Sequence, residues 1–362
     1  MNIISRYMFR NLLGTLALTI IVLSVILVVG TFAKLSGFLA HGVPVKPLLY
    51  MVVLKLPQIL GYTVPFGLLL STILVYNRMS ADYEITAMRA SGISLLQVSM
   101  PAILLSIVLS ALCGWLQLIV APSFSHEARW LVREQGVKNP LAMLDEGRFV
   151  ELFDGMIISI DRRDGDRVEE VRIFRLDDHG RLSADIYAKE GRLIVDEATK
   201  TLNITLSKAS ITTVDPDKPA DRTSMHMSEY TFAIDYGKRF NRKPLTRRAG
   251  DMDLRQLLAY IVLYTESGSS PTRLFVELHK RAAMSLAPFS FILLAIPLGL
   301  LIGRRERSSS ILIGVGVMLA YYSLLTLFET FDDQAQISSH VLMWVPNLVC
   351  QAVGLVLLWR KR

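Results

Sequence analysis

Hydrophobic residues gather in six long runs along the chain. Apolar segments without an internal charge occupy 12–33, 59–76, 98–120, 282–302, 311–328 and 341–359. A helix of about 20 such residues crosses the hydrocarbon core of a bilayer. The pattern therefore predicts six transmembrane helices. The first run follows Arg6 and Arg10, but it is too long for a signal peptide and lacks a convincing small-residue cleavage site, so we interpret it as a retained span.

A different pattern occupies the long polar region between the third and fourth runs. From 147 to 235 the sequence alternates with a period of two in short segments separated by Asp-Gly, His-Gly and Asp-Pro turn signals. The segments are RFVELF, MIISIDRR, VEEVRIFRLDD, LSADIYAKEG, RLIVDE, LNITLSKASITTV and SMHMSEYTFAIDY. This pattern predicts an antiparallel β-sandwich or jelly roll. Helical patterns at 125–135 and 253–264 flank it.

These patterns divide the chain into three parts. Residues 1–121 hold the first three spans and a short polar helix near 80–92, residues 122–270 hold the β domain with short flanking helices, and residues 271–362 hold the last three spans. The predicted fold class is an α-helical membrane protein with six transmembrane helices and an inserted all-β, jelly-roll-like domain.

Basic residues predict the orientation of the spans. Arg78 and Arg89, the arginines at 304, 305 and 307, and the C-terminal Arg360, Lys361 and Arg362 all fall on the side of the N-terminal Arg6 and Arg10 if the chain crosses six times. Short cytoplasmic segments carry such an excess of Lys and Arg. We therefore expect both termini in the cytoplasm and the β domain outside.

Composition narrows the class of protein. The chain is 52% hydrophobic and 20% charged, with a mean hydropathy of +0.40, which suits a membrane protein with a sizeable polar domain. Its net charge of +7 sits largely in the clusters beside the spans, so we do not assign a nucleic-acid partner. Cys113 and Cys350 both lie in apolar runs, which argues against a disulfide framework or a zinc site.

The six histidines show no metal-ligand spacing, and the sequence contains no GxxxxGK[ST] loop. We therefore expect no ATP, metal or cofactor site built by this chain.

The polar segment 77–94 (NRMSADYEITAMRASGIS) is the most distinctive inside loop. If 81–90 is helical, Glu84 shares a face with Ala87 and Met88, and the small residues Ala90, Ser91 and Gly92 follow. A solvated helix face is the usual explanation for such a pattern. A short cytoplasmic helix between two spans can alternatively be the handle by which an external motor moves them.

Three lysines lie near the predicted outer interface, namely Lys34, Lys46 and Lys55. Cations there can bind lipid phosphate groups, or they can extend to the headgroups without a specific role. The second reading is favoured for Lys46 and Lys55, and the two are balanced for Lys34. Proline and glycine inside the spans fit ordinary membrane helices, because neighbouring helices can satisfy the freed backbone groups.

Five segments of the sequence resemble the LptF/LptG (YjgP/YjgQ) family of permeases, with a closer similarity to the LptF branch. They are the N-terminal IISRYMFRNLL, then YEITAMRASGISLLQV, the Ala-Pro at 121–122, NPLAMLDEGRF before the strands and DMDLRQLL after them. The family consists of the membrane subunits of an ABC complex that extracts lipopolysaccharide from the bacterial inner membrane. The resemblance thus implies a non-catalytic transporter subunit.

The resemblance also implies partners and site residues. The family's coupling helix docks on a cytoplasmic ABC ATPase dimer, which uses ATP, and the match places Glu84 there with Arg89 and Ser91 beside it. Lys34 resembles the family's basic residues near the outer end of the first span, and Lys46 is a second candidate for substrate binding. A second permease of the family and a periplasmic jelly-roll acceptor similar to LptC or LptA are the other implied partners.

Lipid chemistry constrains the outside domain. Exposing one acyl chain of about 14 carbons to water costs roughly 10 kcal/mol at about 0.8 kcal/mol per CH₂. A domain that passes lipopolysaccharide should therefore offer a continuous apolar groove. The isoleucines of the strands line either this groove or the domain core, and the core is the default assignment; they are Ile157, Ile173, Ile186, Ile194 and Ile204.

Two other classes of function are weaker. An envelope sensor or binding protein with an outside β domain would need a cytoplasmic output domain, and the longest inside segment is the loop at 77–94. A lipid-modifying membrane enzyme would need clustered acids or histidines at one membrane face. The nearest cluster is Glu277, His279, Lys280 and Arg281, which we interpret as the polar start of the fourth span.

Overall fold

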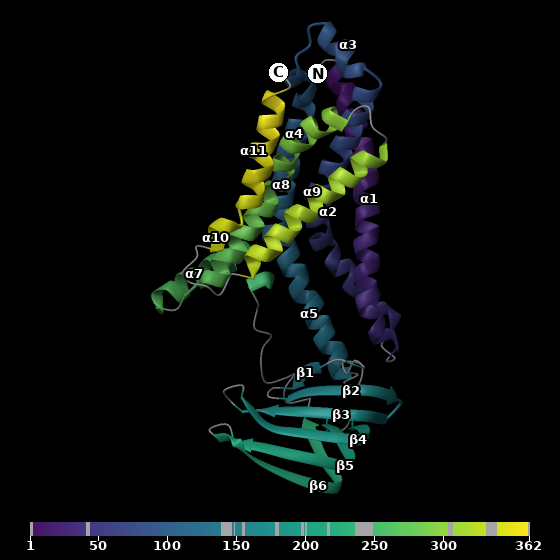
Figure 1. Ribbon diagram of the computed structural model, residues 1–362, viewed down its shortest axis with the longest axis vertical. Coiled ribbons are helices and arrows are strands. Elements are labelled where there is room, and N and C mark those ends of the chain that lie inside the picture. Colours follow the sequence, from purple (N-terminus) through teal and green to yellow (C-terminus); the bar gives the residue numbers. More distant parts are fainter. Residues whose placement is uncertain are drawn as a thin grey trace. The chain divides into compact units, whose positions relative to one another are not determined.

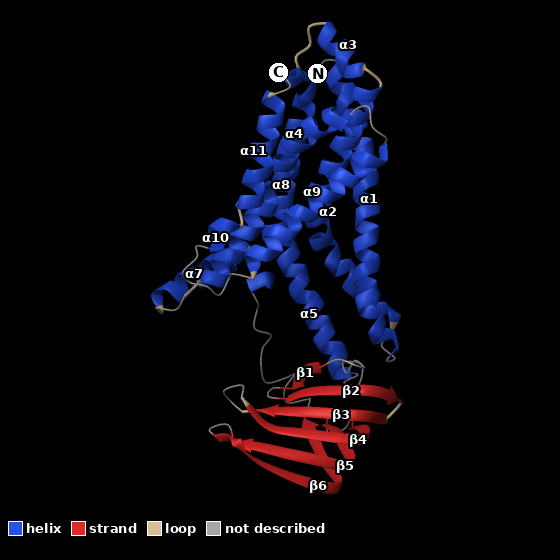
Figure 2. Cartoon of the chain, viewed as in Figure 1, coloured by secondary structure: helices blue, strands red, loops and turns tan. Residues whose placement is uncertain are grey.

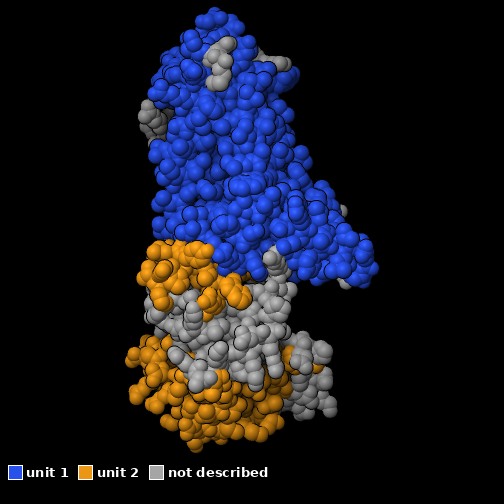
Figure 3. Space-filling view, turned by 180° about the vertical axis from the view of Figure 1, so that it is seen from behind, with its two compact units in different colours: residues 1–31, 52–127, 247–362 blue, residues 32–51, 128–246 orange. Residues whose placement is uncertain are grey.

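The computed structural model describes two compact units of the chain. It covers residues 3–40, 44–138, 147, 149–153, 156–177, 181–196, 199, 201–215, 218–235, 249–268, 270–302, 307–330 and 339–360. The helical unit comprises 1–31, 52–127 and 247–362, and the β unit comprises 32–51 and 128–246 (Figure 3). The three-part division at 121/122 and 270/271 stays a prediction.

Most of the helices drawn in Figure 1 belong to the helical unit. The helices are α1 (Ile3–Ala40), α2 (Val45–Ala81), α3 (Glu84–Ala90), α4 (Leu95–Trp115), the π-helical η1 (Leu116–Val120), α5 (Ala121–Lys138), the 3₁₀ turn η3 (Ala249–Asp251), α7 (Leu254–Glu266), α8 (Thr272–Ile302), α9 (Arg307–Glu329), α10 (Ser339–Leu342) and α11 (Val345–Trp359). Parts of α1, α2 and α5 belong to the β unit. Within the described residues, six helical stretches are long and apolar enough, by length and composition, to cross a membrane: Ile3–Ala33, Val45–Ala81, Leu95–Val132, Thr272–Leu301, Ser309–Glu329 and His340–Trp359. These contain the predicted spans almost entirely, so the prediction of six is confirmed.

The spans α2 and α8 form the centre of the helical unit. Both are mostly covered by other helices, whereas the remaining spans leave most of their apolar surface outward. Phe291 of α8 stacks edge-on against Tyr321 of α9 at 4.8 Å between ring centroids, and both rings are fully buried. The outward apolar surface of the other spans is the surface that hydrocarbon covers in a bilayer.

A proline inside α2 explains one interhelical contact. Pro65 has no N–H, so the carbonyl of Gly61 has no partner within the helix. The side-chain Nε2 of Gln117 donates to that carbonyl at 3.2 Å. Gln117 lies in the π-helical turn η1, which changes the direction of its side chain relative to a regular α-helix. A neighbouring helix thus satisfies the freed group, as expected for membrane helices.

Glycines allow close contacts between helices, of which those at Gly354 and Gly314 are the closest. A Cβ added to Gly354 of α11 would lie 2.5 Å from the carbonyl oxygen of Leu293, the residue four positions before Pro297 in α8. A Cβ at Gly314 of α9 would lie 2.3 Å from the side chain of Leu70 in α2. Gly316, two residues further along α9, has no atom within 4 Å of a Cβ added there. Of these two glycines, only Gly314 allows α9 to pack closely against α2.

The β unit contains one antiparallel sheet with consecutive strand order (Figure 2). Its strands are β1 (Phe149–Phe153), β2 (Met156–Asp164), β3 (Arg167–Leu176), β4 (Leu182–Asp196), β5 (Thr201–Asp215) and β6 (Lys218–Asp235). The inserted antiparallel β domain is therefore confirmed, and its described strands form one sheet rather than the two of a sandwich.

Two segments predicted as separate strands are the single strand β4. The predicted break fell at Gly191, which instead pairs with Val168 on one side and Leu206 on the other. A Cβ at Gly191 would lie 3.0 Å from Leu206 and 3.1 Å from Val168. Glycine here permits close side-chain packing across three strands rather than a turn.

A transverse row of irregular positions crosses this sheet. The pairing register between neighbouring strands skips Asp161, Glu170, Lys189 and Lys208, and the backbone of Glu170 and Lys208 is left-handed, with φ of 51° and 54°. Inward residues on β5 change from even to odd numbers across this row, from Leu206 to Ala209. The change of phase keeps apolar side chains on the same face of the sheet on both sides of the row.

Tyr187 stabilises the row from the outer face. Its hydroxyl donates a hydrogen bond to Glu170, and the guanidinium of Arg172 lies 5.7 Å from the centre of its ring. The hydrogen bond to the Glu170 carboxylate raises the pKa of the Tyr187 hydroxyl above its ordinary value.

The isoleucines divide between core and surface. Ile173, Ile186 and Ile204 are buried in the apolar cluster of the sheet. Ile157 is half-buried, and Ile194 is exposed. The default assignment to the core thus holds for three of the five.

Candidate functional site

The helix α3 is fixed at both ends by its own backbone. It begins after Tyr83, whose φ of 59° is left-handed, and it ends at Ser91 and Gly92, whose φ is 85°. The N–H of Gly92 donates to the carbonyl of Arg89, and the N–H of Ile93 donates to that of Met88, both at 3.0 Å. This pattern is a Schellman cap, which requires glycine at the left-handed position. The predicted helix at 81–90 is thus broken at 82–83, and α3 is only its second part.

One side of α3 packs against the spans. Ile85 is buried in a cluster with Met79 of α2 and Val98 of α4, and Met88 packs against the same cluster. Thr86, Ala87 and Ala90 lie on the opposite side and are exposed. The outer surface of α3 therefore consists of small side chains that permit close approach of another protein.

Glu84 and Arg89 flank this outer surface. At about 100° per residue, both lie about 70° from the centre of the inward face, on opposite sides of it. The hydroxyl of Tyr7 in α1 donates to both carboxylate oxygens of Glu84 at 3.2 Å. Glu84 is also the first residue of α3, where the helix dipole favours a negative charge. The side chain of Arg89 is exposed.

Ser91 has a local contact in the cap. Its hydroxyl donates to the carbonyl of Ala87 at 3.0 Å, and its N–H donates to the same carbonyl. Glu84 and Ser91, seven residues apart, lie on nearly the same side of the helix, whereas Arg89 lies on the other side of its inward face. The sequence identified these three residues, but it gave no sign of the contact between Glu84 and Tyr7.

The spans on either side of α3 are joined to each other and to α9. The hydroxyl of Tyr76 at the end of α2 donates to the carbonyl of Val98 in α4 at 3.2 Å. Asn77 donates to the hydroxyl of Ser310 in α9, and both residues are buried. Ser94 begins α4 with a capping box that it shares with Gln97. A displacement of α3 would therefore be passed to α2, α4 and α9 together.

The outer lysines have different surroundings. Lys46 lies in the first turn of α2 and is exposed, and the ammonium group of Lys55 donates to Gln58 at 3.1 Å. Lys34 belongs to α1, but its side chain lies outside the described residues. The roles of Lys34 and Lys46 in substrate binding stay predictions.

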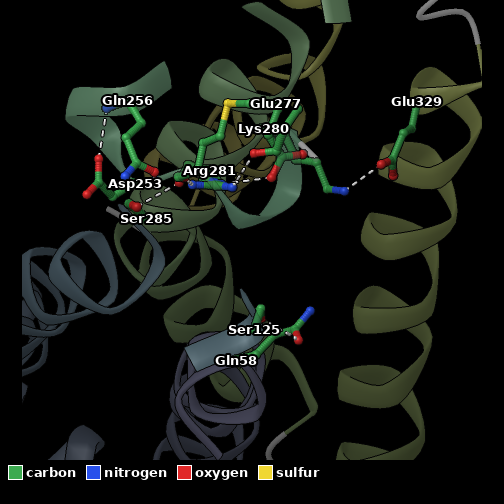
Figure 4. Close-up of polar contacts among 11 residues, drawn as sticks. Gln58, Ser125, Asp253, Gln256, Glu277, Lys280, Arg281, Ser285 and Glu329 are labelled. Atoms are coloured by element: carbon green, nitrogen blue, oxygen red, sulfur yellow. Dashed lines mark hydrogen bonds and ion pairs between the residues drawn. The ribbon is translucent and has the colours of Figure 1, made fainter. Parts of the chain in front are cut away.

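The polar start of α8 is engaged in structural contacts (Figure 4). Lys280 pairs with Glu329 of α9 at 2.6 Å. Arg281 is buried; it pairs with Glu277 at 2.8 Å and donates to the carbonyls of Met252 and Ala249 at 2.7 and 2.9 Å. The fourth residue of this group, His279, has its ring tilted against that of His340 in α10, with 5.1 Å between the ring centroids. These contacts support the interpretation of the cluster as the polar start of a span.

Among the described residues, no three His, Cys, Asp or Glu side chains are grouped so that they could hold a metal ion. Cys113 and Cys350 are both free and buried. A hollow of about 400 Å³ opens between α4, α8 and α11, and the residues that line it carry no charge. Its lining is Leu95, Leu96, Ser99, Ile103, Leu293, Ile296, Leu355, Leu358 and Trp359.

Comparison with known proteins assigns this arrangement to a family. The family model described as lipopolysaccharide export system permease LptF/LptG matches residues 6–360. The lipopolysaccharide export system permease protein LptF of Escherichia coli K12 is 21% identical over 99% of this chain and 95% of its own length, and that of Shigella flexneri matches equally. An uncharacterized protein of Rickettsia prowazekii is 22% identical over 44% of each chain.

Proposed function

The chain belongs to the LptF/LptG family of lipopolysaccharide export permeases, and from this premise we propose that it is the membrane subunit of an ATP-driven lipopolysaccharide transporter. It extracts lipopolysaccharide from the inner membrane and passes it through its periplasmic domain toward the outer membrane. The observation that carries the proposal is the match of the family model over nearly the whole chain, spans and β insert included.

A separate cytoplasmic ATPase dimer binds the ATP and drives the transport. It docks on the small outer surface of α3, where Glu84 and Arg89 contact it from two sides. The short α3, its C-terminal Schellman cap and its buried Ile85 support this role, because a rigid handle transmits a displacement that a mobile loop would absorb. The chain itself carries out no bond chemistry.

The lipid enters the proposed path between two permeases. A second LptF/LptG-type subunit completes the cavity, and Lys34 and Lys46 bind phosphate groups of the lipopolysaccharide near its outer end. The β domain, in the periplasm, then passes the acyl chains to an acceptor of similar fold. Both termini lie in the cytoplasm in this orientation.

Gentle purification of the tagged full-length chain from membranes tests this function. We expect a small ATPase, a second six-span protein and bound lipopolysaccharide to copurify with it. A chain that is recovered alone and without lipopolysaccharide would contradict the proposal and favour an envelope sensor.

A further inference from the structure

The helix α7 leaves an apolar surface uncovered. Only Leu257 and Ile261 of its residues are buried, in a small cluster with Met252 and Leu274. Five large side chains elsewhere around the helix are between 41% and 57% exposed: Leu258, Tyr260, Val262, Leu263 and Tyr264. A short helix that is apolar around most of its circumference needs a further apolar surrounding.

Local contacts fix the direction of α7. Asp253 and Gln256 form a capping box at its start. Arg281 of α8 holds the preceding turn through its bonds to Met252 and Ala249. Figure 1 shows α7 projecting obliquely from the bundle near α10. Its exposed face is therefore held in one place rather than free to fold back onto the bundle.

The length of α8 places α7 at a membrane boundary. The 31 residues of α8 span about 46 Å, which exceeds the hydrocarbon core of about 30 Å by roughly ten residues. The excess corresponds to its polar first turns, where Glu277, Lys280 and Arg281 lie, and these are the turns against which α7 packs. Only residues 267–271 separate α7 from α8, so α7 has to stay at this level.

We propose that α7 is an interfacial membrane helix whose exposed face contacts the lipid of the leaflet at which α8 begins. Its 13 residues are too few to cross the bilayer. Tyr260 and Tyr264, whose rings lie 6.5 Å apart, supply the amphipathic side chains that favour the headgroup layer. The exposed side chains of α7 are nearly as exposed as the outward side chains of α4, such as Leu104 at 58%.

Spin labels on the full-length chain in vesicles of phosphatidylethanolamine and phosphatidylglycerol test this inference. Cys113→Ala and Cys350→Ala remove the two native cysteines. A nitroxide is then attached through Leu258→Cys or Leu263→Cys, with Val108→Cys on the outward face of α4 as the lipid reference and Lys189→Cys on the sheet as the aqueous reference. All four positions are exposed, so the label itself does not disturb a core.

Relaxation of each label by oxygen, which concentrates in lipid, is compared with relaxation by a water-soluble nickel chelate. We expect the ratio of the two at Leu258 and Leu263 to exceed the ratio at Lys189 severalfold and to approach that at Val108. A ratio equal to that of Lys189 would place the face in water and overturn the inference. Low accessibility to both reagents would also overturn it, because a protein surface would then cover the face.

Discussion

Glu84 combines a contact within the chain with a charge that is available to a partner. Tyr7 donates to both of its oxygens, so the carboxylate is oriented while part of its surface stays open. A hydrogen bond to a charged group contributes about 1.5–3 kcal/mol, and less where water competes for it. The hydroxyl of Tyr7 should thus tune the position of Glu84 rather than create the docking site.

Tyr7→Phe tests this division at the residue scale. The substitution removes the hydroxyl and keeps the ring, so we expect weaker binding of the ATPase by no more than about tenfold, equivalent to about 1.4 kcal/mol. Titration of the purified ATPase onto the detergent-solubilised permease measures it. Complete loss of binding in Tyr7→Phe would show that the tyrosine, and not Glu84, makes the principal contact.

Gln117 and Pro65 form a second pair that can be tested at this scale. Gln117→Leu leaves the carbonyl of Gly61 without its donor, and interhelical hydrogen bonds in membranes contribute about 0.6 kcal/mol on average and up to about 1.7 kcal/mol. Pro65→Ala restores an N–H to which that carbonyl can bond. We therefore expect Gln117→Leu to lower the free energy of unfolding in the native chain and to have a smaller effect in Pro65→Ala.

A double-mutant cycle of denaturant unfolding in mixed micelles gives the interaction energy directly. If Gln117→Leu lowered the free energy of unfolding equally in the native chain and in Pro65→Ala, the hydrogen bond from Gln117 would not depend on the unpaired carbonyl of Gly61.

Among the elements, the irregular row of the β-sheet shifts the alternation so that the apolar side chains before and after it share one face. Glu170 and Lys208 adopt left-handed backbone conformations, which cost a residue other than glycine roughly 1–2 kcal/mol. Lys208→Gly should remove this strain and leave stability unchanged or raise it by up to about 1 kcal/mol, because glycine also gains freedom in the unfolded chain.

Lys189→Gly is the matched control, since this residue lies in the same row, is exposed, and is absent from the positive-φ positions. Here we expect a loss of about 0.5–1 kcal/mol, because glycine weakens a strand without relieving strain. Resistance of the β unit to limited proteolysis in the full-length chain ranks the two variants. The opposite order would refute the assignment of strain to Lys208.

The elements differ in how far the sequence predicts them. Each span is an uncharged apolar run of nearly bilayer length, so its existence follows from composition alone. The irregular row in the sheet does not follow from the sequence. Glu170 and Lys208 belong to residue types with no preference for a left-handed backbone, and in the sequence the change of phase cannot be told from an imperfect alternation of apolar and polar residues. The predicted strand break at Gly191 was wrong, because glycine often marks a turn but here fits a narrow space between side chains of the neighbouring strands.

The same limit applies to the candidate site. The family resemblance points to Glu84 as a candidate, but the break at 82–83 and the contact with Tyr7 depend on tertiary packing. Arg281 was assigned to a polar helix start, and nothing local in the sequence shows that it binds two carbonyls about 30 residues earlier in the chain. Contacts between segments that lie far apart in the chain cannot be predicted from local patterns in a single sequence.

For the whole molecule to act as a transporter subunit, work done by an external ATPase has to reach the spans. The packing of α3 on α2 and α4, together with the bond from Asn77 of α2 to Ser310 of α9, provides a continuous path for this displacement within the helical unit. The coupling should accordingly depend on the charge of Glu84 and tolerate changes at neighbouring positions outside the docking surface.

Lipopolysaccharide-stimulated ATP hydrolysis of the complex reconstituted in vesicles with Glu84→Arg tests whether α3 couples the ATPase to the spans. Asp82→Arg is the matched control, because it reverses a charge two residues away in the exposed turn before α3. Helix-dipole effects of either change are limited to about 1 kcal/mol, so both chains should fold. We expect Glu84→Arg to abolish stimulated hydrolysis and ATPase copurification while Asp82→Arg retains both. Undiminished stimulation in Glu84→Arg would contradict the assignment of α3 as the coupling element.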